Sequence, residues 1–301
     1  MIYVLTRGRI GNQIFMYAHA KAIQKKYGKE EKIIIDDTSV IAQEWEDSLP
    51  FYNLENVEFV HSHVELLKPR WILSFFALFI YKVLVHNKDY MKKFNIEKKY
   101  QHFFNRMGLI VCENGYLKAE RLKKNVLLYG YFQSELYFDS VKDEILNEFC
   151  LDKKSLLQEY PGYEDIINRN SVCISIKIQH NVGNGPYDVC TKEYWENAIQ
   201  YMIDNVENPL FFICSDNVEY VKEHLIDTEK YDVICQSKDF PVQISLAMMS
   251  RCKHFIIGNT SFGWWAQYLS KYKDKIVVVP SKWMNVEMPL DIYQKNWIRM
   301  K

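Results

Sequence analysis

The beginning of the chain alternates between short apolar runs and an amphipathic segment. Residues 2–5 (Ile-Tyr-Val-Leu) form an apolar run, which predicts a strand. Apolar side chains then recur at every fourth position over residues 14–22, and this spacing predicts a helix with one apolar face. Gly28 is placed to end that helix, and residues 32–36 predict the next buried strand. The chain is therefore expected to open with a β–α–β unit.

A second and clearer alternation fills the C-terminal half. Apolar runs of strand length are separated there by segments of helix length with one apolar face. The predicted strands are 172–178, 210–214, 233–235, 255–258 and 275–279, and the predicted helices are 192–205, 218–225, 241–251 and 262–270. Strands that alternate with helices of this length favour a right-handed, doubly wound parallel sheet.

The region between the two alternations, residues 45–150, is less regular. It contains one further predicted strand, which runs into a turn at residues 126–132. The segment 151–169 is polar and contains Pro161 and Gly162, which is typical of a linker. We therefore expect two domains, residues 1–155 and residues 156–301.

The longest apolar run covers residues 71–85 and predicts a helix. A membrane-spanning helix needs about 20 apolar residues, so this run, which also contains Lys82, is too short. Packing in the core or against a partner chain is one explanation. The flanking Lys68, Arg70 and Lys88 favour another, peripheral contact with a membrane surface. Because no signal peptide is visible, we expect a cytoplasmic protein, with or without contact to the inner face of the membrane.

Composition agrees with a globular protein and argues against some classes of function. Of the 301 residues, 48% are hydrophobic and 25% are charged, and the formal net charge is +0. A protein that binds nucleic acid normally carries a basic surplus, so nucleic acid is not an expected partner. The seven cysteines are odd in number and include no Cys-x-x-Cys pair. They indicate buried reduced thiols rather than disulfides or a zinc site.

Polar or glycine-containing segments follow most of the predicted strands. These segments are residues 7–12, 179–185, 215–216, 259–261 and 281–283. Ligands of open parallel sheets bind outside the carboxyl ends of the strands. We therefore expect these segments to line one cleft between the two domains.

The first of these segments has the features of an anion site. Gly8 and Gly11 permit close approach of the backbone, and the following helix start offers unpaired N–H groups. Arg7 and Arg9 add two cations that would suit a diphosphate. A tight strand-to-helix turn without a ligand would show the same pattern, because the segment is neither a Walker loop nor a full G-x-G-x-x-G.

A second helix start follows the strand at 255–258. Thr260 can cap that helix, and Asn259 and Ser261 add polar groups beside it. The same three residues match a glycosylation sequon, which is accidental in a chain without a secretion signal. Trp264 and Trp265 follow on the helix, where core packing is expected.

Five segments together resemble the bacterial α-1,2-fucosyltransferases, glycosyltransferase family 11. The matching segments are residues 8–18, 128–138, 212–216, 249–265 and 278–283, which occur in the family's order along nearly the whole chain. The segment at 249–265, with its Gly-Asn-Thr-Ser-Phe-Gly-Trp-Trp, is the most specific. Arg9 stands as in the related motif of the protein O-fucosyltransferases.

The resemblance implies a fold and an activity. The fold is the GT-B type, with two Rossmann-like, doubly wound α/β domains facing a cleft, the first on the acceptor side and the second binding the nucleotide sugar. The activity is an inverting transfer of fucose from GDP-fucose to a galactose-type 2-hydroxyl in surface polysaccharide or O-antigen synthesis. No cofactor or metal is implied to be required. In agreement, no Asp-x-Asp motif follows a predicted strand in the pattern that holds Mg²⁺ on a diphosphate.

One motif of the family is altered. The family carries His-x-Arg-Arg-Gly-Asp after the first strand of the second domain, where the arginines hold the diphosphate. Lys177 replaces the first arginine and lacks its bidentate fork, Ile178 replaces the second, and His180 replaces the aspartate. Ser245 stands near a position where the family has an aspartate. Three alternatives therefore stay open: a weaker enzyme, a different nucleotide sugar, or a relative that binds without turnover.

The expected donor site draws on both domains. Its binding residues are expected to be Gly8, Gly11, Asn12, Lys177, Asp216, Asn259, Thr260, Ser261 and Phe262. Arg9 and Lys177 would stabilise the negative charge that develops on the leaving diphosphate.

Deprotonation of the acceptor hydroxyl calls for a general base, for which Asp36, Asp37, His180 and Asp216 are candidates. We expect Arg9, Asp36 and His180 to be the catalytic residues. Asp216 also suits a strand-end cap, and His180 also suits an ordinary surface loop.

Overall fold

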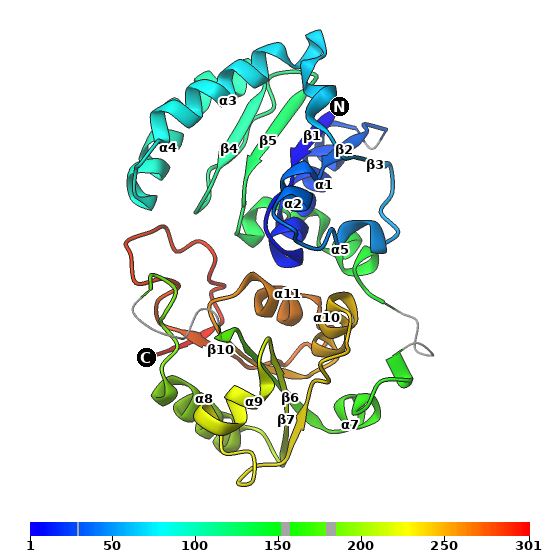
Figure 1. The fold of residues 1–301 in the computed structure, drawn as a ribbon, viewed down its shortest axis with the longest axis vertical. Helices are drawn as coiled ribbons and strands as arrows, with labels where there is room; N and C mark the ends of the chain where they lie inside the picture. The colour runs from blue at the N-terminus through cyan, green and yellow to red at the C-terminus, as the bar shows by residue number, and fades with distance from the viewer. Residues whose placement is uncertain (29, 152–156, 179–184) are drawn as a thin grey trace. The chain divides into compact units, whose positions relative to one another are not determined.

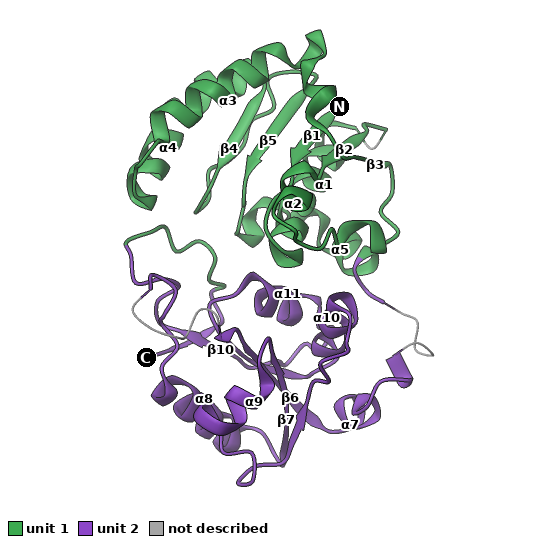
Figure 2. Ribbon diagram, viewed as in Figure 1, with its two compact units in different colours: residues 1–148, 287–294 green, residues 149–286, 295–301 purple. Residues whose placement is uncertain are grey.

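The computed structural model describes residues 1–28, 30–151, 157–178 and 185–301, which form two compact α/β units (Figure 1). Unit 1 comprises residues 1–148 and 287–294, and unit 2 comprises residues 149–286 and 295–301 (Figure 2). Each unit contains one parallel sheet with helices, so the expected α/β class is confirmed. The expected boundary between residues 155 and 156 lies outside the described residues.

The sheet of unit 1 has five parallel strands in the order β3-β2-β1-β5-β4. They are β1 (Ile2–Leu5), β2 (Ile33–Asp36), β3 (Val57–Val60), β4 (Leu109–Cys112) and β5 (Val126–Gly130). The strand order reverses at β1, which lies between β2 and β5. Reversals of strand order in doubly wound sheets are positions where ligands commonly bind.

Helices cover both faces of this sheet (Figure 1). On one face, α3 (Ile72–Val85) and α4 (Tyr90–Met107) pack on alternate strand residues such as Tyr3 and Leu127. On the other face lies α1 (Ile10–Tyr27), which is buried over most of its length and ends at Gly28 as expected. The shorter helical pieces are α2 (Thr38–Ala42), α5 (Lys142–Glu148) and the 3-10 turns Leu49–Phe51, His63–Leu67, Pro69–Trp71, Glu135–Tyr137 and Asp139–Val141.

The sheet of unit 2 has six parallel strands in the order β11-β10-β9-β6-β7-β8, which is the strand order of a Rossmann fold. They are β6 (Asn170–Ile176), β7 (Pro209–Ser215), β8 (Val233–Cys235), β9 (His254–Ile257), β10 (Val277–Pro280) and β11 (Ile298–Met300). The helices are α7 (Tyr163–Asn168), α8 (Lys192–Asn205), α9 (Val218–Tyr220) with a π turn at Val221–Leu225, α10 (Val242–Ser250) and α11 (Ser261–Leu269).

The core of unit 2 is built on both sides of β6. Val172 and Ile174 pack with Trp195 of α8, and each such buried branched side chain contributes about 1.5–3 kcal/mol. On the opposite face, α11 lies so close to the sheet that a Cβ on Gly263 would come 2.9 Å from the Oγ of Ser175. Trp264 and Trp265 are fully buried, which confirms the expected core packing.

Most predicted elements are present in both alternating regions, within a few residues of the expected bounds. The strands β3, β4 and β11 and the helix α4 were not predicted, nor were the short helices α2, α5 and α7, the last of which lies in the expected linker. The predicted helix at 218–225 is instead a single α turn followed by a π turn. All seven cysteines are free thiols, as expected.

Gly130, at the end of β5, is required by its backbone conformation and its surroundings. Its φ is +153°, and a Cβ there would come 2.0 Å from the carbonyl oxygen of Cys112 on β4. Gly28 has a similar φ of +137°, but a Cβ there would meet nothing closer than 3.9 Å. Any other residue would therefore be strained at both positions, but only at Gly130 would its Cβ also collide with a neighbouring atom.

Gly130→Ala is expected to lower the free energy of unfolding by at least about 3 kcal/mol, because β4 and β5 would have to separate. Gly28→Ala, with strain alone, should cost about 1–2 kcal/mol. Urea unfolding followed by circular dichroism measures both losses. Equal losses for the two variants would show that the collision with Cys112 does not contribute to the loss of stability.

Candidate active site

In unit 1 the opening turn, residues 7–12, meets the segment 128–138 at the carboxyl ends of β1 and β5. Gly8 has a φ of +75°, and a Cβ there would lie 2.5 Å from the side-chain nitrogen of Asn12. The Oδ1 of Asn12 accepts a hydrogen bond of 2.9 Å from Nε2 of Gln133, just after β5. Two segments about 120 residues apart in the chain are thus joined beside the reversal of strand order.

Gln13 is fully buried and fixes the shape of the same turn. Its Nε2 donates to the carbonyl oxygens of Gly8 at 3.0 Å and Glu46 at 2.9 Å, and its Oε1 accepts from the amide of Ser48 at 3.0 Å. The side chain therefore ties the turn after β1 to the loop at 46–48. Three satisfied hydrogen bonds also explain why an amide is tolerated inside the core.

The two arginines of the turn have different surroundings. Arg7 forms an ion pair with Glu113 and lies 4.4 Å and 4.3 Å from the ring centres of Tyr129 and Tyr131. Arg9 precedes α1 as its N-cap residue and is exposed, and its guanidinium makes no hydrogen bond or ion pair in the described part of the chain. Of the two, Arg9 is the cation positioned to meet a ligand.

The ends of β2 and β3 bring two buried carboxylates against two histidines. Asp36 and Asp37 have no exposed surface. The Nδ1 of His63 lies 2.6 Å from Oδ2 of Asp36, and the Nδ1 of His61 lies 2.7 Å from Oδ2 of Asp37. Both histidine side chains are at least half exposed. The sequence singles out Asp36 and Asp37 but not the two histidines, which follow the unpredicted strand β3.

Asp37 also pairs with a third carboxyl, that of Asp47. Burial raises the pKa of Asp47 to about 7, and the hydrogen bond with Asp37 adds to the shift. The Oδ1 of Asp37 is buried and has no hydrogen-bond partner among the described residues. The pattern is that of two carboxyl groups sharing one proton.

In unit 2 the strand order reverses between β6 and β9, and the expected donor residues lie at this edge. Lys177 follows β6 and is partly buried. The amide of Ile178 donates to Oδ1 of Asp216 after β7, at 2.7 Å, so Asp216 holds the backbone beyond Lys177 in place. Ile178 itself is buried and offers no polar side-chain group. His180 lies outside the described residues.

Asn259 and Thr260 use their side chains inside the protein. The Nδ2 of Asn259 donates to the carbonyl oxygens of Tyr187 and Trp283, at 2.9 Å and 3.0 Å. The Oγ1 of Thr260 caps α11 by accepting from the amide of Gly263 at 3.1 Å. The amides of Ser261 and Phe262, in the first helical turn, have no intrahelical acceptor and can face an anion.

Ser245, which replaces an expected aspartate, lies on α10 and is buried. Its Oγ accepts a hydrogen bond of 2.9 Å from Nε2 of Gln236. A neutral hydroxyl satisfies this position without a buried charge, which agrees with the altered donor motif.

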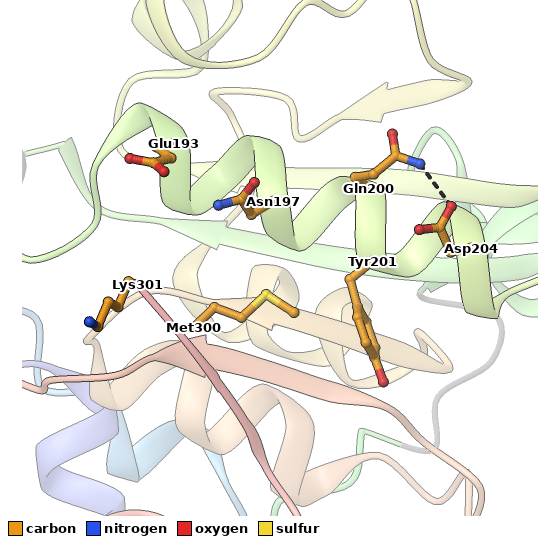
Figure 3. Close-up of a pocket in the computed structure, with 7 residues that line it drawn as sticks. All are labelled: Glu193, Asn197, Gln200, Tyr201, Asp204, Met300 and Lys301. Carbon is orange, nitrogen blue, oxygen red and sulfur yellow. Dashed lines mark hydrogen bonds between the residues drawn. The ribbon is translucent and has the colours of Figure 1, made fainter.

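A surface hollow of about 350 Å³ lies on α8 and β11 (Figure 3). Its lining residues are Glu193, Asn197, Gln200, Tyr201, Asp204, Met300 and Lys301. None of them follows the carboxyl end of β6, β7 or β9, so we do not assign the donor site to this hollow. Within the described ranges, no group of three or more His, Cys, Asp and Glu side chains is arranged to hold a metal ion.

Comparison with known families decides the identity of the chain. The model of Glycosyl transferase family 11 matches residues 1–301. The chain belongs to this family. It is therefore a glycosyltransferase, and the resemblance found in the sequence motifs is confirmed.

Similar proteins place this family 11 glycosyltransferase among bacterial and animal enzymes. The Escherichia coli O-antigen biosynthesis glycosyltransferase WbnK is 27% identical, over 99% of this chain and 100% of the relative. An Escherichia coli alpha-1,2-colitosyltransferase is 25% identical, over 98% and 97%. Galactoside alpha-(1,2)-fucosyltransferase 2 of Pongo pygmaeus is 24% identical, over 87% and 67%.

Among solved structures, a mutant of Arabidopsis thaliana FUT1 in complex with GDP is similar with a TM-score of 0.52. The likeness covers 92% of this chain and 70% of that chain at 10% identity, so it concerns the fold alone. It confirms the GT-B fold class expected for this family 11 glycosyltransferase.

The pairing of Asp37 with Asp47 predicts a pH effect on the stability of the glycosyltransferase. The pKa of Asp47 is raised to about 7 from its ordinary value of 3.8, so its favourable contribution is complete below about pH 4 and is lost as the pH rises toward 7. Asp47→Asn keeps an N–H donor for Asp37 and does not ionise. The variant should match wild type near pH 4 and exceed its free energy of unfolding by about 1 kcal/mol at pH 8, a value reduced for solvent screening because Asp47 is partly exposed.

Chemical unfolding at pH 4, 6 and 8 measures this difference, with the exposed Asp274→Asn as the matched control. A difference between Asp47→Asn and wild type that stays constant across the three values would contradict the shared proton.

Proposed function

We propose that this glycosyltransferase moves fucose from GDP-fucose, with inversion, to the 2-hydroxyl of a galactose-type acceptor in surface polysaccharide or O-antigen synthesis. The observation that carries the proposal is the edge of unit 2 where β6 and β9 end. It gathers Lys177, Asp216 and the start of α11, at the reversal of strand order where Rossmann folds bind nucleotides. The names of the O-antigen and α-1,2-fucosyltransferase relatives support the reaction class.

In this proposal the protein stabilises the diphosphate as it leaves. The amides of Ser261 and Phe262 and the side chain of Lys177 would contact it from unit 2, because helix starts and cations favour anions. Arg9 would add its guanidinium from unit 1. Fixed charges aimed at the leaving group favour the transition state over the ground state, and such electrostatic stabilisation commonly contributes more to catalysis than any other effect.

The remaining donor-binding residues would act mainly through shape. Gly8 and Asn12 set the path of the opening turn, Gly11 lies in the first turn of α1, and Asn259 holds two loops around the start of α11. Asp216 would position the segment that bears Lys177. We keep His180 among the catalytic candidates on the strength of the resemblance, together with Arg9 and Asp36. Unit 1 would serve the acceptor and unit 2 the donor.

A second candidate donor, another nucleotide sugar, is favoured by one observation. Ile178 is buried and apolar where the family motif has an arginine, so a second guanidinium is missing from the donor side. One relative is named a colitosyltransferase rather than a fucosyltransferase. A change of donor within the family would be consistent with both facts.

A panel of GDP-, UDP-, CMP- and dTDP-sugars, with release of the nucleotide as the readout, separates the two donors. We expect GDP-fucose to be turned over, with and without EDTA, and millimolar GDP to raise the melting temperature. Arg9→Ala should lower kcat/KM by about 10²-fold and Lys177→Ala by about tenfold, because each removes a charge from the diphosphate.

Arg106→Ala, an exposed arginine at the end of α4, is the matched control and should leave turnover unchanged. Turnover of a different nucleotide sugar, with no effect of GDP on the melting temperature, would replace GDP-fucose by that donor. An unchanged kcat/KM in Arg9→Ala would remove Arg9 from the site.

We further propose that α3 holds the enzyme at the inner face of the membrane. One side of the helix packs on the sheet through Ala77, Leu78 and Tyr81, whereas Phe79 and Phe75 on the outer side are 62% and 48% exposed. The other exposed apolar side chains of the helix are Ile72, Leu73, Phe76 and Val83. No described helix is long and apolar enough to cross a bilayer.

Charge argues for a lipid surface as the partner of this outer face. Residues 66–88 contain four cations, Lys68, Arg70, Lys82 and Lys88, and no carboxylate side chain. Lys68 and Arg70 are ion-paired with Glu65, just before this segment, and Lys82 and Lys88 follow in the helix and just beyond its end. An apolar helix face flanked by basic residues and lying in the interface plane is typical of proteins that bind anionic bilayers.

Phe75→Ser combined with Phe79→Ser should reduce co-sedimentation with vesicles of phosphatidylglycerol and phosphatidylethanolamine by about tenfold or more, because both rings would otherwise enter the bilayer. Ile203→Ser, an exposed apolar residue on α8, is the matched control. Neutral phosphatidylcholine vesicles should bind wild type only weakly. Equal binding by the double variant, or a dimer that the double variant abolishes, would show that α3 has another partner.

A further inference from the structure

Three side chains form a continuous hydrogen-bonded chain from the core of unit 1 to its surface. The hydroxyl of Tyr3 donates to Oδ2 of Asp36 at 2.6 Å, and the Nδ1 of His63 lies 2.6 Å from the same oxygen. The amide of Thr38 donates to Oδ1 of Asp36 at 3.0 Å. Tyr3 and Asp36 have no exposed surface, whereas half of the His63 side chain is exposed.

This arrangement fixes the roles of the two ring nitrogens of His63. The Asp36 carboxylate already accepts hydrogen bonds from Tyr3 and Thr38. A carboxylate can only accept, so the Nδ1 of His63 must carry the proton and act as a third donor. The tautomer with the proton on Nδ1 leaves a lone pair on Nε2. A buried carboxylate that orients an imidazole in this way also stabilises the imidazolium formed when Nε2 takes up a proton.

The neighbouring pair of His61 and Asp37 differs in two respects. Asp37 is tied to a second carboxyl, Asp47, rather than to a hydroxyl and an amide. The His61 side chain is also more exposed, at 66%. The carboxylate of Asp37 therefore orients the ring of His61 less firmly than Asp36 orients the ring of His63. His63 is the better-defined base.

We propose that His63 is the general base that takes the proton of the acceptor hydroxyl, and that Asp36 is the residue that positions it. The proposal rests on the proposed function. The acceptor O–H bond breaks, and its proton goes to Nε2 of His63. The acceptor oxygen bonds to C1 of the sugar while the bond from C1 to the phosphate oxygen breaks, and that electron pair leaves with the nucleoside diphosphate. The imidazolium then returns its proton to solvent.

Asp36 itself is poorly placed to take the proton directly. The sequence marks it as a candidate base, but its carboxylate is buried and engaged by three groups. Its effect on the reaction passes through the ring of His63. His63 comes from the turn that follows β3, where it begins the 3-10 turn His63–Leu67.

The test follows GDP release from GDP-fucose by the full-length enzyme, with lactose as acceptor and with water alone. His63→Ala should lower kcat by about 10²- to 10⁴-fold while leaving the KM for GDP-fucose and the melting shift caused by GDP unchanged. Added imidazole should restore part of the lost rate. Asp36→Asn should also lower kcat, because an amide no longer favours the proton on Nδ1, and imidazole should not rescue it.

Two control variants distinguish loss of the proposed base from misfolding and from loss of donor binding. His102→Ala, an exposed histidine on α4, should leave kcat unchanged. His61→Ala should lower kcat by less than about tenfold, because its ring is less firmly oriented. A His63→Ala enzyme that binds GDP normally and retains its kcat would overturn the inference alone, as would a large loss confined to His61→Ala. A wild-type enzyme that turns over no nucleotide sugar would overturn both the proposed function and this inference.

Discussion

Moving a polar group out of water costs free energy unless a protein group replaces the hydrogen bonds that it made to solvent. This constraint governs the carboxyl ends of both sheets. Gln13 bonds to three backbone groups, Asn259 bonds to two carbonyl oxygens, and Arg7 pairs with Glu113. These motif side chains are engaged within the protein. They shape the loops that follow the strands.

Electropositive groups also lie at the carboxyl ends of the strands. Arg9 is exposed at the start of α1, and the amides of Ser261 and Phe262 lie in the first turn of α11. Lys177 follows β6, beside the reversal of strand order in unit 2. In the proposed reaction, an enzyme that lacks one guanidinium at residue 178 depends more on such groups, and Arg9 offers a planar guanidinium that can bond two phosphate oxygens at once.

The sequence predicts the two sheets well where apolar periodicity is strong, and less well at their edges. β3 has three partly buried residues and the exposed Glu58, and β11 has only three residues. Such short, partly buried strands lack the apolar signal of central strands. β4 is fully buried, but it is a run of four residues in the irregular region 45–150 and was missed as well. α4 was missed for another reason: its Lys-rich surface hides a helix whose end signals are visible. Asp89 caps its start, and Gly108 ends it with a φ of +84°.

The residues of the candidate site also divide into those that the sequence predicts and those that it does not. Asp36, Arg9 and the residues around Thr260 follow predicted strands, so the rule on carboxyl ends finds them. His61 and His63 follow β3, and without that strand they look like ordinary loop histidines. The pairing of Asp37 with Asp47 depends on a loop held by Gln13, which no periodicity encodes. Side chains brought together by tertiary structure alone are the part of a site that a single sequence conceals.

The proposed base and the proposed membrane helix share one short segment of unit 1, residues 63–71. His63 begins this segment, and Trp71 ends it as the residue that precedes α3. The ring of Trp71 packs edge-on against Tyr3 at 5.3 Å, and Glu65 holds Lys68 and Arg70 beside it. The inner side of α3 therefore supports the segment that carries His63, while Phe75 and Phe79 point outward. Substitutions at the outer positions can separate membrane binding from catalysis, because they leave the contacts of Trp71 and Glu65 intact.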